Sequence, residues 1–114
     1  MGWDAYAKGM GDNRGRMLEE FSVAAAKVVA NTGLVDGGVR HGQLDCRECG
    51  LALQRATGAD AWSEEPWDVD MVKRLAASAV WNLNIEVDQR WAYASARAFL
   101  ETCAILGLSI SFSY

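Results

Sequence analysis

The chain has 114 residues, of which 51% are hydrophobic and 23% are charged, and this composition is typical of a folded globular protein and excludes a disordered one. Fifteen acidic residues against eleven basic ones give a net charge of −4, the wrong sign for neutralising many phosphates, so we expect no direct nucleic-acid partner. The length predicts a single compact domain over residues 1–114.

The apolar runs are short. The two longest, at residues 23–30 and 98–108, are too short or too interrupted by charge to cross a bilayer, so we expect no membrane association. The chain does not open with a basic flank and an apolar stretch, so no secretory signal is predicted. Three cysteines, an odd number, fit poorly with a disulfide framework. We therefore expect a cytoplasmic protein with free thiols.

The first predicted helix begins after Asp12 or Asn13, which are good N-cap residues, and continues with apolar residues spaced three and four apart. It should end at Gly33, a suitable left-handed cap. Residues 34–42 contain three glycines and predict a turn-rich connection.

A second helix is predicted over residues 43–57, with Gly58 as its stop. Its inward positions are expected to be Leu44, Cys49, Leu51, Leu53 and Ala56.

A third helix is predicted to begin within residues 63–68, because capping residues, first-turn acids and an early proline suit a helix N-terminus. Its expected core face consists of Val69, Val72, Ala76, Ala79, Val80 and Leu83.

The fourth helix is predicted to run from about Val87 to Gly107. Its core face is expected to contain Trp91, Ala94, Ala98, Phe99, Thr102 and Leu106.

The last seven residues change period, because apolar residues alternate with serines from Leu108 to Tyr114, and this pattern predicts a half-buried strand. Its best internal partner is the segment Trp3–Ala7, and residues 38–40 are the second choice. If neither pairs, a second subunit would complete the strand, so a structural homo-oligomer is one alternative function. The predicted fold class is α+β, mainly α, with about four helices and a minimal sheet.

The stretch from Asp60 to Asp70 combines carboxylates with indoles and contains no basic residue. Its candidate partner-binding residues are Asp60, Trp62, Glu64, Glu65, Trp67, Asp68 and Asp70. Carboxylates there can meet a basic groove on another protein while the two indoles act as anchors. The alternative is structural: the acids favour the positive end of the third helix, and the indoles cover the edge of the core.

A second candidate is a Cys-x-x-Cys pair with a nearby histidine, at a spacing that zinc accepts. The possible ligands are His41, Cys46, Cys49 and Cys103, with Asp45 as a substitute for the last. We favour core packing for the cysteines and therefore predict no metal or other cofactor. A small zinc-binding domain is the alternative function. A redox pair is a third interpretation, but the Cys-x-x-Cys motif lacks the preceding strand and the following helix of a thioredoxin-like unit.

Five tryptophans are many for this length, and we expect most in the core and one or two on a surface used for association. The single histidine, with no Gly-rich phosphate loop and no nucleophile elbow, predicts that the protein is not an enzyme.

The opening Met1-Gly2-Trp3-Asp4-Ala5-Tyr6-Ala7 resembles the start of small accessory proteins encoded by bacteriophages and prophages. The resemblance covers these seven residues and transfers no functional residue. Compact acidic phage products of this length are often inhibitors of host defence, anti-CRISPR proteins among them, and act by binding. It therefore implies a non-enzymatic inhibitor of a host defence complex. The acidic, tryptophan-bearing segment, expected from its own residues to bind a basic surface of another protein, is compatible with that role.

Overall fold

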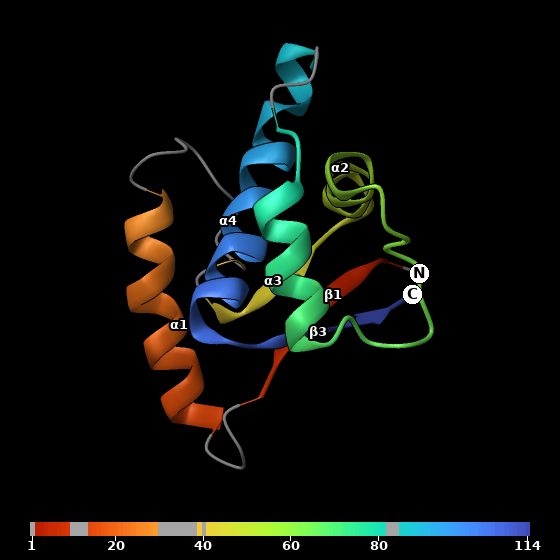
Figure 1. The fold of residues 1–114 in the computed structure, drawn as a ribbon. Coiled ribbons are helices and arrows are strands. Elements are labelled where there is room, and N and C mark those ends of the chain that lie inside the picture. Colours follow the sequence, from red (N-terminus) through yellow and green to blue (C-terminus); the bar gives the residue numbers. More distant parts are fainter. Residues whose placement is uncertain (1, 10–13, 30–38, 40, 82–84) are drawn as a thin grey trace.

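The computed structural model describes residues 2–9, 14–29, 39, 41–81 and 85–114 (Figure 1). In chain order its elements are β1 (Asp4–Lys8), α1 (Arg14–Val29), β2 (Gln43–Asp45), α2 (Arg47–Thr57), α3 (Val69–Ser78), the 3-10 turn η2 (Val87–Gln89), α4 (Arg90–Leu106) and β3 (Ser109–Ser113). The four α-helices and the small sheet of the described residues confirm the predicted class, α+β and mainly α.

The sheet is antiparallel, with strand order β2-β1-β3. β1 pairs with β3 from Asp4 opposite Ser113 to Lys8 opposite Ser109. This pairing confirms that the C-terminal strand joins the N-terminal segment, and it brings the two termini side by side (Figure 1). Of the second-choice partner, residues 38–40, only Val39 is described.

The predicted helix over residues 43–57 is wrong in its first turn, because Gln43–Asp45 form β2 and the helix starts only at Arg47. These three residues pair with β1, from Tyr6 opposite Gln43 to Asp4 opposite Asp45. A main-chain hydrogen bond flanks the pairing at each end: Ala7 N donates to Gly42 O at 2.9 Å, and Cys46 N donates to Trp3 O at 3.1 Å. Leu51, expected inside, is exposed, whereas the other four predicted inward positions are buried. Gly58 ends α2 in the left-handed conformation, as predicted.

The helix α3 begins at Val69, directly after the predicted start region, and the Asp68 side chain caps it by accepting a hydrogen bond from Met71 N at 2.8 Å. Glu64, Glu65 and Pro66 precede this cap, so they do not form the first turn that was predicted. The helix ends at Ser78, earlier than its apolar pattern suggests. Val80 is therefore exposed and not part of a core face, and Leu83 lies outside the described residues. The predicted boundaries of the first helix, Asp12, Asn13 and Gly33, also lie outside them.

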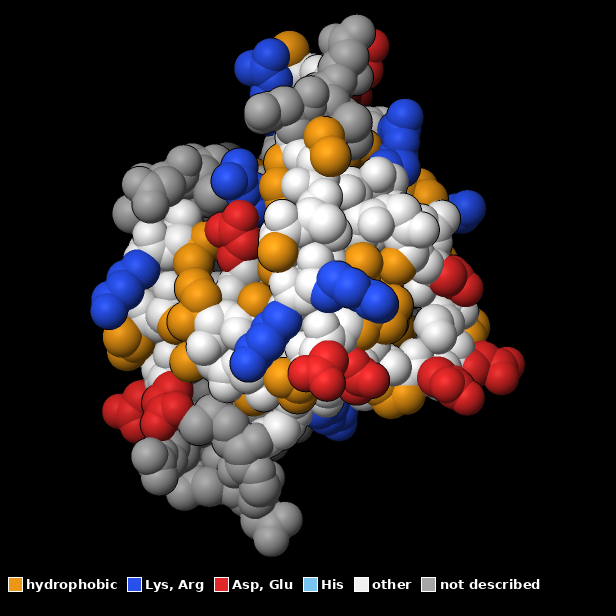
Figure 2. All heavy atoms as spheres, viewed as in Figure 1, with side chains coloured by type: hydrophobic (Ala, Val, Ile, Leu, Met, Phe, Trp, Pro, Cys, Tyr) orange, Lys and Arg blue, Asp and Glu red, His pale blue; other side chains and the backbone are white. Residues whose placement is uncertain are grey.

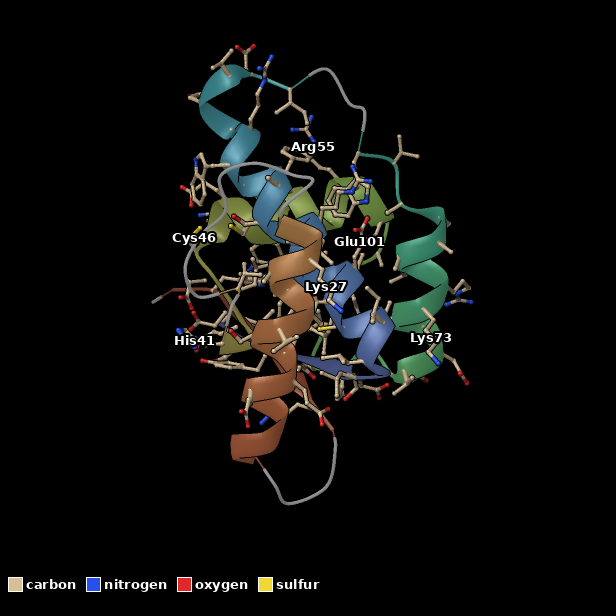
Figure 3. All side chains as sticks on the ribbon, turned by 90° about the vertical axis from the view of Figure 1, so that its left-hand side faces the viewer. Lys27, His41, Cys46, Arg55, Lys73 and Glu101 are labelled. Atoms are coloured by element: carbon tan, nitrogen blue, oxygen red, sulfur yellow. The ribbon has the colours of Figure 1, made fainter. Side chains whose placement is uncertain are left out.

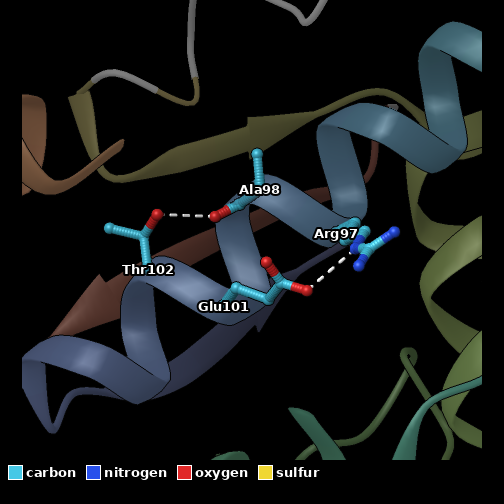
Figure 4. A network of polar contacts seen from close by, with 4 residues as sticks. All are labelled: Arg97, Ala98, Glu101 and Thr102. Carbon is cyan, nitrogen blue, oxygen red and sulfur yellow. Dashed lines mark hydrogen bonds and ion pairs between the residues drawn. The ribbon is translucent and has the colours of Figure 1, made fainter. Parts of the chain in front are cut away.

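The helix α4 is the central element, because it contacts α1, α2 and α3. It ends at Gly107 with φ 68°, confirming the predicted stop. Trp91 is exposed at its start, contrary to the expected core face. The buried hydroxyl of Thr102 is satisfied within the helix, because Thr102 Oγ1 donates to Ala98 O at 2.6 Å (Figure 4).

None of the described helices combines the length and the apolar character needed to span a membrane.

Candidate functional site

Trp67 lies in the core, and its role as a surface anchor is therefore a wrong prediction. The side chain is 2% exposed, and the main chain forms a two-way bridge with Ile110 at 2.9 and 3.0 Å. The indole Nε1 donates to Asp60 O at 3.2 Å, and the ring meets Phe112 edge-on at 4.9 Å. A large ring next to a strand gains more from burial than from exposure.

Trp62 also belongs partly to this aromatic cluster. It is half-buried, and its ring centroid lies 5.7 Å from that of Trp3, which is itself buried. Trp3 Nε1 donates to Ala61 O at 2.7 Å, so the indole is satisfied inside the protein. The predicted tryptophan-bearing surface thus retains only an edge of Trp62.

The bridge to Trp67 also occupies the outer edge of β3 at Ile110. A second subunit cannot extend the sheet at that residue without displacing Trp67. At Ile110, β3 therefore has no free edge through which a homo-oligomer could be joined.

The carboxylates of the segment, in contrast, are all exposed: Asp60, Glu64, Glu65, Asp68 and Asp70. Asp60 and Asp68 have internal roles, because each accepts a main-chain hydrogen bond, from Trp62 N at 2.9 Å and from Met71 N at 2.8 Å. In Figure 2 acidic side chains gather along the lower edge of the molecule, below α3. The structure thus brings the predicted acidic residues together on one exposed segment, named the acidic segment below.

The four predicted metal ligands are not brought together. Cys46 and Cys49 are adjacent, but His41 is exposed and Cys103 is buried within α4, where desolvation raises the pKa of its thiol. Among the described residues, no group of three or more histidine, cysteine or acidic side chains is placed to hold a metal ion. The zinc interpretation therefore gains no support from the geometry.

The Cys46–Cys49 pair has a structural context that the sequence interpretation missed. A strand, β2, ends one residue before Cys46, and α2 begins one residue after it. The two Sγ atoms are 3.4 Å apart. The objection that the motif lacks a preceding strand and a following helix is therefore wrong.

A surface groove between α1 and α4 has a volume of about 570 Å³. Val23 and Ile105 line it and are 59% and 66% exposed, and Glu19, Glu20 and Lys27 flank them. Hydrophobic side chains are visible between these helices in Figure 2. Sequence reasoning missed this groove, although Ile105 is an apolar residue outside the predicted core face of its helix.

Arg97, the exposed base in the middle of α4, pairs with Glu101 one turn later at 2.8 Å (Figure 4). The pair is an ordinary i, i+4 contact on the surface.

Comparisons with protein-family models, curated proteins and solved structures found no match to this chain. No relative therefore supplies a functional residue for it.

The solvent-facing side of the sheet carries two carboxylates directly opposite each other, Asp4 on β1 and Asp45 on β2. Burial raises the pKa of Asp45, a hydrogen bond with Asp4 raises it further, and the hydrogen bond from Gln43 Nε2, 2.5 Å long, partly opposes them. The pKa of Tyr6 is raised by its own burial and then by Asp4. Protonation of Asp45 thus favours the folded state.

Replacement of Asp45 by asparagine is expected to stabilise the protein at pH 7. A carboxyl group whose pKa is raised by folding stabilises the fold below its unfolded pKa, and this contribution is lost as the pH rises through the folded value. The gain should be about 0.2–1 kcal/mol, the range for opposed strand residues, and should shrink below about pH 4. Urea titrations from pH 3 to 8 measure it, with the exposed Asp88→Asn as control. A gain independent of pH would contradict the raised pKa of Asp45.

Proposed function

We propose that this chain is a non-enzymatic protein-binding module whose acidic segment binds a basic surface of another protein. The observation that carries the proposal is five exposed carboxylates within residues 60–70, a stretch without any lysine, arginine or histidine. Carboxylates held together on one side of a folded protein create a local negative potential, which attracts and orients a basic partner.

The buried tryptophans support this proposal in a role different from the one expected. The bridge from Trp67 to Ile110 and the tilted contact of the Trp62 ring with Trp3 attach the acidic segment to the core. A segment that is already ordered loses less conformational entropy when it binds. The indoles therefore act as internal supports for the carboxylates, and the exposed part of Trp62 adds a small apolar contact beside them.

The resemblance of the first seven residues to phage-encoded accessory proteins suggests a setting for this binding. Within the proposal, the basic partner is a component of a host defence complex, and binding inhibits it by occupying a surface that otherwise meets phosphates. This part rests on the resemblance and on the sign of the charge.

The test compares two double variants with the same net charge. Glu64→Lys/Glu65→Lys reverses the acidic segment, and Glu86→Lys/Asp88→Lys reverses two exposed acids near the start of α4. Each substitution adds two charges, so both variants change the net charge from −4 to 0. We expect the first variant to weaken binding of a synthetic lysine- and leucine-containing peptide by roughly tenfold or more, and the second to weaken it by less than about threefold.

The affinity is measured by calorimetry at physiological salt. Equal weakening by both variants would mean that the peptide responds only to net charge and would overturn the proposed site, as would unchanged binding by the first variant. Far-UV circular dichroism verifies that each variant is folded.

A further inference from the structure

Two cysteines meet at the junction of β2 and α2. Cys46 is the N-cap residue of α2, and Cys49 lies in its first turn, in the 11-residue helix Arg47–Thr57. Neither forms a disulfide, and Cys46 Sγ contacts Cys49 Sγ at 3.4 Å. A disulfide requires a sulfur–sulfur distance of about 2.05 Å, so the thiols are about 1.4 Å from bonding distance.

The two thiols differ in access. Cys46 is half-buried and lies at the outer end of α2 (Figure 3), whereas Cys49 is fully buried. An external molecule can therefore reach Cys46, but it cannot reach Cys49 directly. This asymmetry is what a pair needs when one thiol attacks and the other resolves the product.

The main chain at Cys46 is strained. Its φ of 78° and ψ of 148° are values that glycine adopts readily, and among the described residues no other non-glycine has a positive φ. Hydrogen bonds from Cys46 N to Trp3 O at 3.1 Å and from Gly50 N to Cys46 O at 3.3 Å hold this conformation. Such strain persists only where surrounding contacts impose it, and it is concentrated at functional sites.

We propose that Cys46 and Cys49 form a dithiol–disulfide exchange site, whose substrate class is an accessible disulfide on another molecule. Cys46 is the attacking thiol, and Cys49 is the resolving thiol. This activity is independent of partner binding by the acidic segment.

The exchange proceeds in two balanced steps. The Cys46 thiol loses its proton to water, and its sulfur attacks one sulfur of the substrate disulfide, which forms a mixed disulfide and releases the other half as a thiolate that takes up a proton. The Cys49 thiol then loses its proton, and its sulfur attacks Cys46 Sγ and releases the remaining half as a second thiol. Two protein thiols are oxidised to one disulfide, and the substrate disulfide is reduced to two thiols.

The surroundings of Cys46 determine the pH at which the pair reacts. Burial raises the pKa of its thiol, the hydrogen bond with Cys49 lowers it, and the carboxylate of Glu48 raises it. Because only the thiolate attacks, exchange should be slow at neutral pH and should accelerate up to about tenfold per pH unit below that pKa.

The experiment treats the reduced full-length protein with glutathione disulfide at pH 8 and follows its intact mass without denaturant. The wild-type protein should lose the mass of two hydrogens, without a lasting adduct, as the internal disulfide forms. Cys49→Ala should accumulate one glutathionyl group at Cys46, because the mixed disulfide cannot be resolved, and Cys46→Gly should form neither product. Cys103→Ala, which removes the other buried thiol, should behave as wild type.

Cys46→Gly is the informative loss-of-thiol variant, because glycine tolerates the local φ and should leave the protein folded. Peptide mapping of the oxidised wild type provides a result that does not depend on any variant. A wild-type protein that keeps both thiols reduced, a disulfide that involves Cys103, or a Cys49→Ala variant that is folded but takes up no glutathione would each overturn the proposal.

Discussion

Replacement of Trp67 by alanine is expected to lower the free energy of unfolding by about 3–5 kcal/mol. The ring is 2% exposed and packs edge-on against Phe112, and its Nε1 donates to Asp60 O. Alanine would leave a cavity next to β3 and an unpaired carbonyl at Asp60. Because domains of this size are commonly stable by only about 5–15 kcal/mol, this loss would leave the variant marginally stable.

Urea unfolding followed by far-UV circular dichroism measures this loss independently of tryptophan fluorescence. Trp91→Ala is the matched control, because that indole is 38% exposed at the start of α4, and it should cost less than about 1 kcal/mol. A loss at Trp67 no larger than that at Trp91 would mean that the Trp67 ring is not part of the core, and its role as a surface anchor would return.

Replacement of Gly50 by alanine is expected to destabilise the protein by about 1–3 kcal/mol. A Cβ atom at this position would lie 2.8 Å from Cδ2 and Cε2 of Trp3 and 3.1 Å from Cη2 of Trp62. The Trp3 ring cannot retreat easily, since it is buried and its Nε1 is bonded to Ala61 O. The overpacking should therefore outweigh the gain of up to about 1 kcal/mol that alanine brings to a helix.

The same unfolding measurement tests this variant, and near-UV circular dichroism reports the rearranged indoles. Gly2→Ala is the control, because a Cβ there meets nothing within 4 Å, and it should change stability by less than about 0.5 kcal/mol. Increased stability of Gly50→Ala would contradict the close approach of α2 to Trp3.

The candidate sites were only partly predictable from sequence. The acidic residues could be found from their spacing and from the lack of bases among them, because charged side chains of a short surface segment remain exposed in most folds. The roles of Trp62 and Trp67 could not be predicted in this way, because an aromatic side chain suits both a core and an interface. The structure decides between them through the bridge from Trp67 to Ile110.

The Cys-x-x-Cys motif was likewise only partly predictable from the sequence. Its spacing was visible in the sequence, but its position depends on β2, a strand of three residues, Gln43–Asp45. Three residues are too few to display a period of two, and the following helical pattern includes Leu44 by chance. The strand forms because Gln43–Asp45 pair with the main chain of β1, and this pairing joins parts of the chain that are far apart in sequence.

The sequence by itself determined the α+β class, an α3 start close to residues 63–68, the α2 and α4 stops at Gly58 and Gly107, and the alternating strand at the C-terminus. These features depend on local periodicity, capping and glycine conformation, which act over a few residues. Only the tertiary structure decided which tryptophans are buried, where α2 begins, and that two thiols touch beside a strained residue. Those outcomes depend on packing and main-chain pairing between segments far apart in the chain, which no local pattern records.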